Sequence, residues 1–328
     1  PEDTDMLLIL APTKINDLQL KAIDQFLMRG GSVVVSTSPF NVLIGQTITA
    51  NEHQSGMESW LENLGFEIPS EMVLDPQSTS LPVPVQRYIG GIPIREIQLV
   101  PYPHFPDLRS DGVDQNHPIT STLNQMTLNW ASPILVNNEV TKTEKITSLF
   151  KSSSSSWSSE ELEVIPDFES YPDTGFDIEG DRNSKILALA VNGPFDSYFK
   201  DVEETNDSVK DIINSSPASS RLVLVASNSF AADGAIDISS HALNTLYTKP
   251  IEFMQNATEW SIEDEGLSAL RGRSQFARTL LPMSEENQKK WEIVNYIFAL
   301  LGLLLVWFWR NRSVKNDRNR YQNILKNI

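Results

Sequence analysis

The hydroxyl groups that follow apolar runs are the first candidates for chemistry in this 328-residue chain. Ser36, Ser38 and Ser227 each come just after a run typical of a strand, but none lies in the GxSxG turn that exposes a nucleophilic serine. Serines at strand ends commonly hydrogen-bond backbone groups instead. The chain contains no cysteine, so thiol nucleophiles, disulfides and thiolate metal ligands are excluded. We therefore expect no catalytic residue.

Metal and phosphate chemistry are not supported by the spacing of the other candidates. Acidic pairs such as Glu160-Glu161 lack the spacing of a calcium loop and indicate a solvated face. Gly30-Gly31 and Gly90-Gly91 lie outside any GxxxxGKS/T sequence, so no phosphate-binding loop is present. The four histidines are far apart and none has HExxH spacing: His53, His104, His117 and His241. We expect no metal ion, no cofactor and no ATPase activity.

The longest apolar stretch lies near the C-terminus, from Ile293 to Trp309, where Asn295 is the one polar interior residue. A helix of this length spans roughly 25 Å, close to the roughly 30 Å of a hydrocarbon core. A buried core helix is the alternative, but such a helix usually keeps a polar stripe. We expect one transmembrane helix over 289–310, anchored at the membrane–water boundaries by Trp291, Tyr296, Trp307, Trp309, Arg310 and Arg312.

Charge is distributed unevenly about this segment. The tail 310–328 has six basic residues and one acid, while the nineteen residues 272–290 have four basic residues. This excess predicts a cytoplasmic tail and a large domain outside the cytoplasm. Subtracting the tail's +5 from the chain's −17 leaves −22 on residues 1–309, and such a surface should repel nucleic acid and anionic lipid. The predicted partner is a lipid bilayer, with no nucleic acid.

The chain opens on a strand, helix, strand pattern. Residues 6–10 and 32–36 are apolar runs typical of strands covered on both faces. Between them Asn16 and Gln19 have the spacing of a capping box, and Gly30-Gly31 closes the helix. Such a β-α-β unit predicts parallel strands.

Similar patterns recur later. The runs 186–191 and 222–226 predict two more buried strands, and eight prolines between 69 and 106 favour extended segments, with a strand at 92–100. Helices are expected at 57–64, 241–247 and 251–260, with a short strand at 66–68. We predict an α/β fold with an open, mostly parallel sheet flanked by helices, plus the C-terminal transmembrane helix.

Residues 151–159 contain seven serines around Trp157, a composition typical of a flexible linker. Trp157 itself is expected to dock, either onto the sheet as structure or against a ligand, where the hydroxyls would bind a glycan or peptide. Pro1 is not an initiator Met, so we expect the chain to be part of a longer polypeptide. We divide it into a first α/β part (1–150), a Ser-rich and acidic connection (151–184), a second α/β part (185–285), the transmembrane helix (289–310) and the tail (311–328).

Five features taken in order resemble the gliding-motility-type (GldG-like) auxiliary component of ABC transport systems. They are the opening DMLLILAPTKINDLQLKAIDQFLMRGGSVVVSTSP, the later HPITSTLNQMTLNWASPI, TSLFKSSSSSW, RLVLVASNSF, and the terminal single span. The resemblance covers nearly the whole chain. It implies an extracytoplasmic α/β domain similar to a glutamine amidotransferase that has lost its catalytic residues, on the periplasmic side of a bacterial inner membrane.

Two functions follow as alternatives. The first is a non-catalytic, membrane-anchored accessory subunit whose partners are an ABC permease and a separate ATPase subunit. The second is a free-standing envelope module that binds a glycan or peptide and is anchored by the same helix. Copurification with a permease and an ATPase would distinguish the two.

Overall fold

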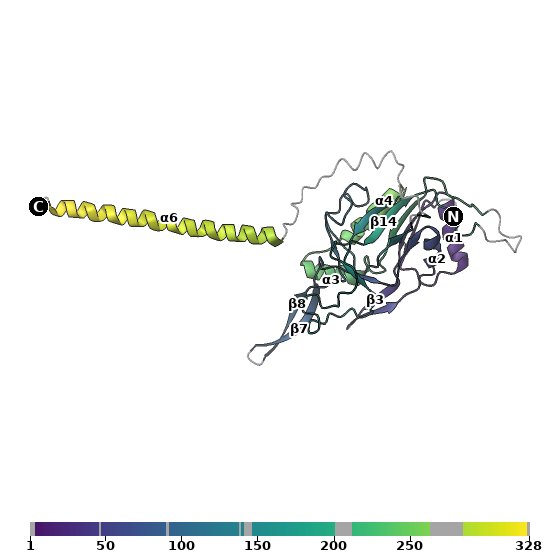
Figure 1. Ribbon diagram of the computed structural model, residues 1–328, viewed down its shortest axis with the longest axis horizontal. Helices are drawn as coiled ribbons and strands as arrows, with labels where there is room; N and C mark the ends of the chain where they lie inside the picture. Colours follow the sequence, from purple (N-terminus) through teal and green to yellow (C-terminus); the bar gives the residue numbers. More distant parts are fainter. Residues whose placement is uncertain are drawn as a thin grey trace. The chain divides into compact units, whose positions relative to one another are not determined.

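The computed structural model describes residues 4–45, 47–89, 92–137, 139–140, 146–200, 212–262 and 285–326. The chain divides into two compact units, residues 1–277 and 278–328. The first unit carries the sheets and the shorter helices, and the second carries one long helix (Figure 1). The fold is mixed α/β with one C-terminal helix long and apolar enough to cross a membrane.

The first unit is built on a five-stranded sheet. Its strands lie in the order β1 (Met6–Leu10), β2 (Ser32–Ser36), β15 (Arg221–Val225), β14 (Ile186–Asn192) and β12 (Ile146–Lys151). β2 pairs in parallel with both β1 and β15, whereas β14 pairs antiparallel with both β15 and β12. The sheet is therefore mixed.

The expected mostly parallel open sheet is wrong for a physical reason. A strand buried on both faces has an apolar run whatever the direction of its neighbours, so the runs in β14 and β15 carry no information about direction. A parallel pair needs a crossover, usually a helix, between its strands. The described part of the connection from β14 to β15 contains no helix, in keeping with their antiparallel pairing.

The β-α-β unit at the N-terminus is confirmed. Helix α1 (Asp17–Met28) begins at a complete capping box: Asn16 Oδ1 accepts from the Gln19 N–H at 3.0 Å, and Gln19 Oε1 accepts from the Asn16 N–H at 3.1 Å. Each contact satisfies a backbone donor that a helix start leaves without an intrahelical partner. Gly30 follows the helix with φ of +104°, a conformation that costs glycine little.

Side chains alternate between the two faces of the sheet. Val33 and Val35 of β2 pack with Leu27 of α1 and with Trp60 of α2 (Glu58–Asn63). Val34 points to the opposite face, where the core includes Phe253 and Ala257 of α4 (Lys249–Ile262). This period of two, with helices on both faces, explains why β2 is buried along its whole length.

A third core lies among small antiparallel sheets. It contains Tyr102, Phe105, Trp130 and Trp157, all buried. The two-stranded sheets are β3 (Phe40–Ile44) with β4 (Ile48–Glu52), β5 (Phe66–Glu67) with β11 (Leu135–Val136), β6 (Met72–Leu74) with β13 (Trp157–Ser159), β7 (Leu81–Ile89) with β8 (Ile92–Val100), and β9 (Asp107–Leu108) with β10 (Met126–Thr127). Extended structure in the proline-rich region is thus confirmed.

Helix α3 spans Asp233–Leu243, earlier in the chain than the expected helix at 241–247. Its end is set at Asn244, whose φ of 51° is left-handed and stops the helix before Tyr247. The second unit is helix α6 (Glu285–Lys326), which extends the expected transmembrane helix at both ends.

Candidate membrane anchor and interaction surfaces

Helix α6 contains the candidate membrane anchor. Its span runs from Lys289 to Arg312, 24 residues, and no part of the most apolar window is buried. At about 1.5 Å per residue this span is roughly 36 Å long, enough to cross the hydrocarbon core. Trp307 is 62% exposed and Trp309 81% exposed, so the rings have no partner within the described chain. Such an apolar surface is costly in water and stable in lipid.

The two ends of the span carry aromatic and basic side chains, which position a helix in a bilayer. Trp291 and Tyr296 lie toward its start, and the Tyr296 hydroxyl donates to Glu292 Oε1 at 3.1 Å. Arg310 and Arg312 are exposed at its end. Aromatic rings and guanidinium groups favour the membrane–water boundary, so the six expected anchor residues lie on one continuous helix.

Serines at the strand ends have structural partners. The Ser36 hydroxyl donates to the Ser227 carbonyl, and the Ser227 hydroxyl donates to the Asn129 carbonyl at 2.7 Å. The Ser38 and Ser132 hydroxyls lie 3.0 Å apart. No histidine takes part in these contacts, which tie together strand ends rather than form a nucleophile and its base.

The four histidines occupy separate environments. His53 Nε2 lies 2.7 Å from the Pro12 carbonyl, and the His117 ring packs against Trp260. His104 is buried against Tyr102 and Phe176, with neither ring nitrogen hydrogen-bonded among the described residues. Burial lowers the pKa of His104 to about 3 and that of His117 to about 4. Within the described ranges no group of three histidine or acidic side chains could hold a metal ion.

The Ser-rich run differs from the flexible linker that its composition indicates. Asp75 accepts from the Ser153 N–H and the Ser153 hydroxyl, each at 2.6 Å. The Ser152 and Ser156 hydroxyls lie 2.6 Å apart, and Ser156 also donates to the Asn183 carbonyl at 2.7 Å. Burial raises the pKa of Asp75, while the contacts from Ser153 lower it. Specific hydrogen bonds therefore hold this run in place.

Trp157 lies directly after these serines and is fully buried. It belongs to β13, which pairs antiparallel with β6. Its indole N–H donates to the Asp177 carbonyl at 2.9 Å, and its ring packs in the third core. The structure therefore places the ring among protein atoms, where its faces are covered.

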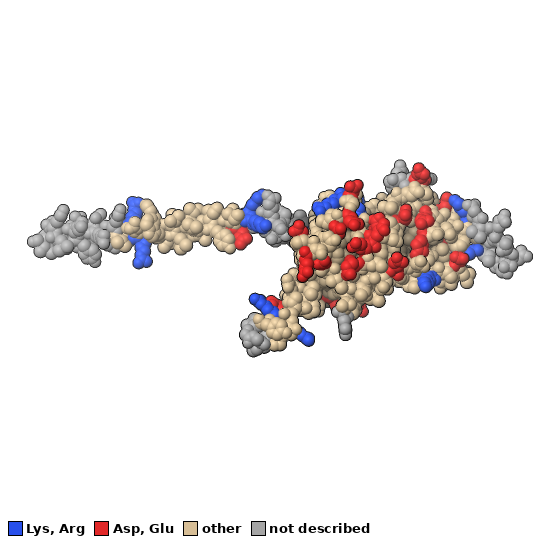
Figure 2. Space-filling view, turned by 60° about the horizontal axis from the view of Figure 1, so that its bottom comes forward, with Lys and Arg blue, Asp and Glu red and all other residues tan. Residues whose placement is uncertain are grey.

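An acidic segment, residues 160–184, follows β13 and contains nine acids and one base, Arg182. The Val164 carbonyl accepts from the Tyr102 hydroxyl at 2.7 Å, which fixes the segment to the third core. Glu160, Glu161, Glu179 and Asp181 line a hollow of about 660 Å³ with neighbouring polar groups. Acidic side chains form several patches on the face of the body shown in Figure 2. This surface favours basic partners and repels anionic ones.

A second hollow, of about 730 Å³, lies beside Thr37 and Ser38, at the carboxyl end of β2, where open α/β sheets commonly bind ligands. Two of its lining residues hydrogen-bond each other: Glu58 Oε1 accepts from the Ser55 N–H at 2.8 Å and from the Ser55 hydroxyl at 3.0 Å. Sequence reasoning missed this hollow because distant segments form it, 14–15, 37–39, 53–62 and 66–70.

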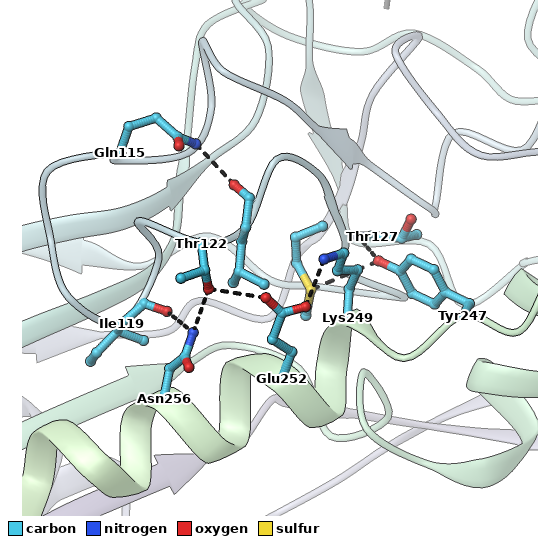
Figure 3. A network of polar contacts seen from close by, with 10 residues as sticks. Gln115, Ile119, Thr122, Thr127, Tyr247, Lys249, Glu252 and Asn256 are labelled. Atoms are coloured by element: carbon cyan, nitrogen blue, oxygen red, sulfur yellow. Dashed lines mark hydrogen bonds and ion pairs between the residues drawn. The ribbon is translucent and has the colours of Figure 1, made fainter. Parts of the chain in front are cut away.

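Polar contacts fasten the loop before β10 to α4, and β10 itself to Tyr247 just before α4 (Figure 3). Asn256 donates to the Ile119 carbonyl at 2.9 Å and to the Thr122 hydroxyl at 3.0 Å, and Thr122 donates to Glu252 at 3.0 Å. Lys249 pairs with the other Glu252 oxygen at 2.6 Å. The sequence HPITSTLNQMTLNWASPI, residues 117–134, contains Ile119 and Thr122, so these contacts give that segment a structural role.

A two-stranded hairpin, β7 with β8, carries several exposed apolar side chains. Tyr88 and Ile97 are more than half exposed, and Ile94 and Leu99 are over 40% exposed. Leu81, where the hairpin leaves the body, is buried. The hairpin is therefore a candidate contact surface, which sequence reasoning described only as an extended region.

Comparisons with known proteins gave a family match, a relative of similar sequence and an alignment with a solved structure. A family profile described as an ABC-type uncharacterized transport system matches residues 1–257. An uncharacterized protein of Borreliella burgdorferi (strain ATCC 35210 / DSM 4680 / CIP 102532 / B31) is 23% identical over 212 residues, which make up 63% of this chain and 39% of that protein. The match thus spans about two fifths of the relative's length. Among solved structures, the mmIFT52 N-terminal domain aligns with a TM-score of 0.40 and 11% identity, over 80% of this chain and 78% of that one.

Proposed function

The chain belongs to the auxiliary family of ABC-type transport systems, and we propose that it is a non-catalytic accessory subunit anchored in a membrane by helix α6. The observation that carries the proposal is the combination of this family match with a 24-residue apolar span that has no partner in the described chain. Because the match covers only part of the curated relative, the activity of the whole assembly belongs to this proposal too.

In this proposal other chains supply the energy and the transport pathway. The sequence contains no GxxxxGKS/T loop to hold a nucleotide phosphate. One candidate span is present among the described residues, whereas a pathway needs several helices with polar groups facing inward. The proposed partners are therefore a permease and a separate ATPase subunit.

We place the large domain outside the cytoplasm, on the periplasmic side of a bacterial inner membrane, with the tail in the cytoplasm. Six basic residues in 310–328 against four in 272–290 support this orientation. Within the family, the order of the quoted sequence features supports a gliding-motility-type component. The confirmed β1-α1-β2 unit is compatible with a degenerate amidotransferase-like origin.

Helix α6 would pack beside the helices of the permease. A side chain built at Gly302 would meet no atom within 4 Å, so this position leaves room for close approach of another helix. The acidic face shown in Figure 2 would meet a basic surface of the permease or of the substrate.

Affinity purification from the cells that encode the chain tests the proposal. The full chain, tagged and extracted in mild detergent, should copurify with a multispanning permease and with a protein that contains a phosphate-binding loop, in fixed stoichiometry. Mass spectrometry would identify both. Replacing Leu301 and Leu304 by Lys should remove both partners, whereas replacing them by Ala should retain them.

A solitary chain in the same extract would contradict the accessory role. It would favour the alternative of an envelope module anchored by the same helix. In that case glycan or peptide binding by the purified chain becomes the relevant assay, and the hollow of about 730 Å³ next to β2 is the place to examine first.

A further inference from the structure

The hairpin formed by β7 and β8, here called the arm (residues 81–100), projects from the body (Figure 1). Its strands pair with each other over nine positions, from Leu81 opposite Val100 to Ile89 opposite Ile92. Val83 and Val100 pack on the third core, so the base of the arm is fixed to the body. The part beyond the base offers both faces to the surroundings.

Register determines which side chains share a face. Tyr88 lies opposite Pro93, Ile97 opposite Pro84, and Leu99 opposite Pro82. These six residues share one face with the polar pair Gln86 and Arg95. Tyr88 is 67% exposed, Ile97 61% and Leu99 49%. Ile94 lies on the other face, opposite Arg87, and is 43% exposed. Toward its free end each face of the arm therefore has an exposed apolar side chain, Tyr88 on one face and Ile94 on the other.

The edges of the arm are unsuited to binding another strand. Pro82 and Pro84 in β7 and Pro93 in β8 have no N–H, so they cannot donate to an added strand. Within a two-stranded sheet, prolines are tolerated where the N–H would point away from the partner strand, which is the outer edge. The side-chain surface, rather than the backbone edge, is the part of the arm left for contact.

The charge of the arm is opposite to that of the rest of the large unit. Residues 81–100 carry Arg87, Arg95 and Glu96, a net charge of +1, within residues 1–309 that carry −22. The Arg87 and Glu96 side chains lie 3.9 Å apart and are both more than half exposed. In Figure 2 basic side chains stand out on the arm, in contrast to the acidic body. An anionic surface would therefore be repelled by the body and tolerated by the arm.

We propose that the free end of the arm inserts into the interfacial layer of an anionic lipid bilayer, with Arg87 and Arg95 at the level of the lipid phosphates. This inference rests on the membrane attachment in the proposed function. Both strands run two to three residues beyond the arginines, which is roughly 7–10 Å. Interfacial elements bury their apolar groups to about 5–10 Å, so the length fits.

Lipid fits this surface better than a protein partner does. A docked protein covers one face of a hairpin, whereas lipid surrounds an inserted end on all sides. Tyr88 and Ile94 are exposed on opposite faces at nearly the same level, so one partner surface would leave one of them in water. The aromatic ring next to arginines matches the composition of the membrane–water boundary.

Probes at single introduced cysteines test the proposal, because the chain contains no native cysteine. The full chain is reconstituted in nanodiscs that contain anionic lipid and lipids bearing a nitroxide. Tyr88→Cys, Ile94→Cys and Ile97→Cys are each labelled with an environment-sensitive fluorophore. Ser155→Cys, an exposed position on the body, is the matched control, and Phe298→Cys reports on α6.

The expected result is at least threefold stronger lipid quenching at positions 88 and 94 than at 155, with 97 between them. Double substitution Arg87→Glu and Arg95→Glu should bring the quenching at 94 down to the level of 155. If 298 is quenched and 88 and 94 are quenched only by aqueous iodide, the arm inference fails while the anchor stands. If 298 is not quenched, the anchor itself fails.

The proposal would also be overturned if position 88 were shielded from iodide only when a partner protein is added, or only when a second copy of the chain is present in the same nanodisc. In that case the arm would be a protein-docking element. Nanodiscs loaded with one chain each separate that outcome from lipid insertion.

Discussion

Trp157 and Trp307 have opposite surroundings in the same chain. Trp157 follows a run of serines and is completely buried, whereas Trp307 lies in the most apolar stretch and is 62% exposed. In the first case a polar segment folds against the body because specific hydrogen bonds satisfy its hydroxyls and backbone groups. In the second, the apolar side chains of the span are exposed.

The difference shows where each segment finds its partner. The contact that holds Ser153 is with Asp75, 78 residues away in the sequence, inside the same chain. The partner proposed for α6 is the lipid bilayer, outside the chain: the most apolar window of its 24-residue span has no buried residue. Lipid is the partner whose chemistry matches an exposed apolar surface all round the helix.

The largest expected effect comes from charging the middle of α6. Replacing Leu301 and Leu304 by Lys should cost about 3 kcal/mol of insertion free energy per lysine, because each ammonium group must leave water. The variant should be released from membranes by alkaline carbonate, while the Ala variant at both positions stays bound. Retention of the Lys variant would show that α6 does not depend on lipid.

The next effect concerns Trp157, which leaves a large cavity when shortened. We expect Trp157→Ala to lower the free energy of unfolding by about 3–5 kcal/mol, because a buried ring and its hydrogen bond are lost. Scanning fluorimetry of the full chain in detergent measures it, and Trp307→Ala is the matched control, with a change within about 0.5 kcal/mol. If the two substitutions lowered the free energy of unfolding equally, the contrast between a buried Trp157 and an exposed Trp307 would be wrong.

Removing the acceptor for the serine run should have a smaller effect. Asp75→Ala leaves the Ser153 N–H and hydroxyl without their partner and should cost about 2–3 kcal/mol. Asp173→Ala, at an exposed carboxylate in the acidic segment, should have no measurable effect. Protease cleavage within 151–159 should also become faster in the Asp75 variant. An unchanged cleavage rate would support the flexible linker after all.

The contribution of the buried histidines to stability does not change near neutral pH and decreases only on acidification. His104 and His117 have native pKa values of about 3 and about 4, below the unfolded value near 6.5, so the unfolded chain binds more protons between these limits. Stability should therefore be full above pH 6.5 and fall as the pH is lowered toward 4. The slope is at most about 1.4 kcal/mol per pH unit for each histidine.

Replacing His104 by Phe isolates one of these two contributions. His104→Phe keeps a ring in the aromatic cluster and should reduce the slope by up to one proton. Chemical denaturation at several pH values measures it. A slope that does not change in the His104 variant would mean that this histidine is protonated in the native state.

Sequence reasoning succeeded where the signal is local. The capping box at Asn16 involves residues three positions apart, and the apolar run of α6 is continuous, so both elements could be predicted. The same holds for the apolar runs of β1 and β2 and for the helix that carries Trp60.

Long-range contacts explain what could not be predicted. Hydrogen bonds to Asp75 hold the serine run in place, and the direction of β14 depends on its neighbours in the sheet. Both are long-range contacts, which the local amino-acid composition does not reveal. The end of α3 depends on the left-handed conformation of a single asparagine. From the sequence, the arm could be predicted only as an extended proline-rich segment. The exposure of its apolar side chains could not be predicted, because it depends on whether other parts of the fold pack against them.

The measurement that tests the central claim most directly is the sidedness of two introduced cysteines in intact cells. Ser155→Cys lies on the body and Ser313→Cys follows the span, so a membrane-impermeant maleimide should label position 155 in intact cells. Position 313 should be labelled only after the membrane is opened. Labelling of both positions from the same side would show that α6 does not cross the membrane, and the account of an anchored accessory subunit would be contradicted.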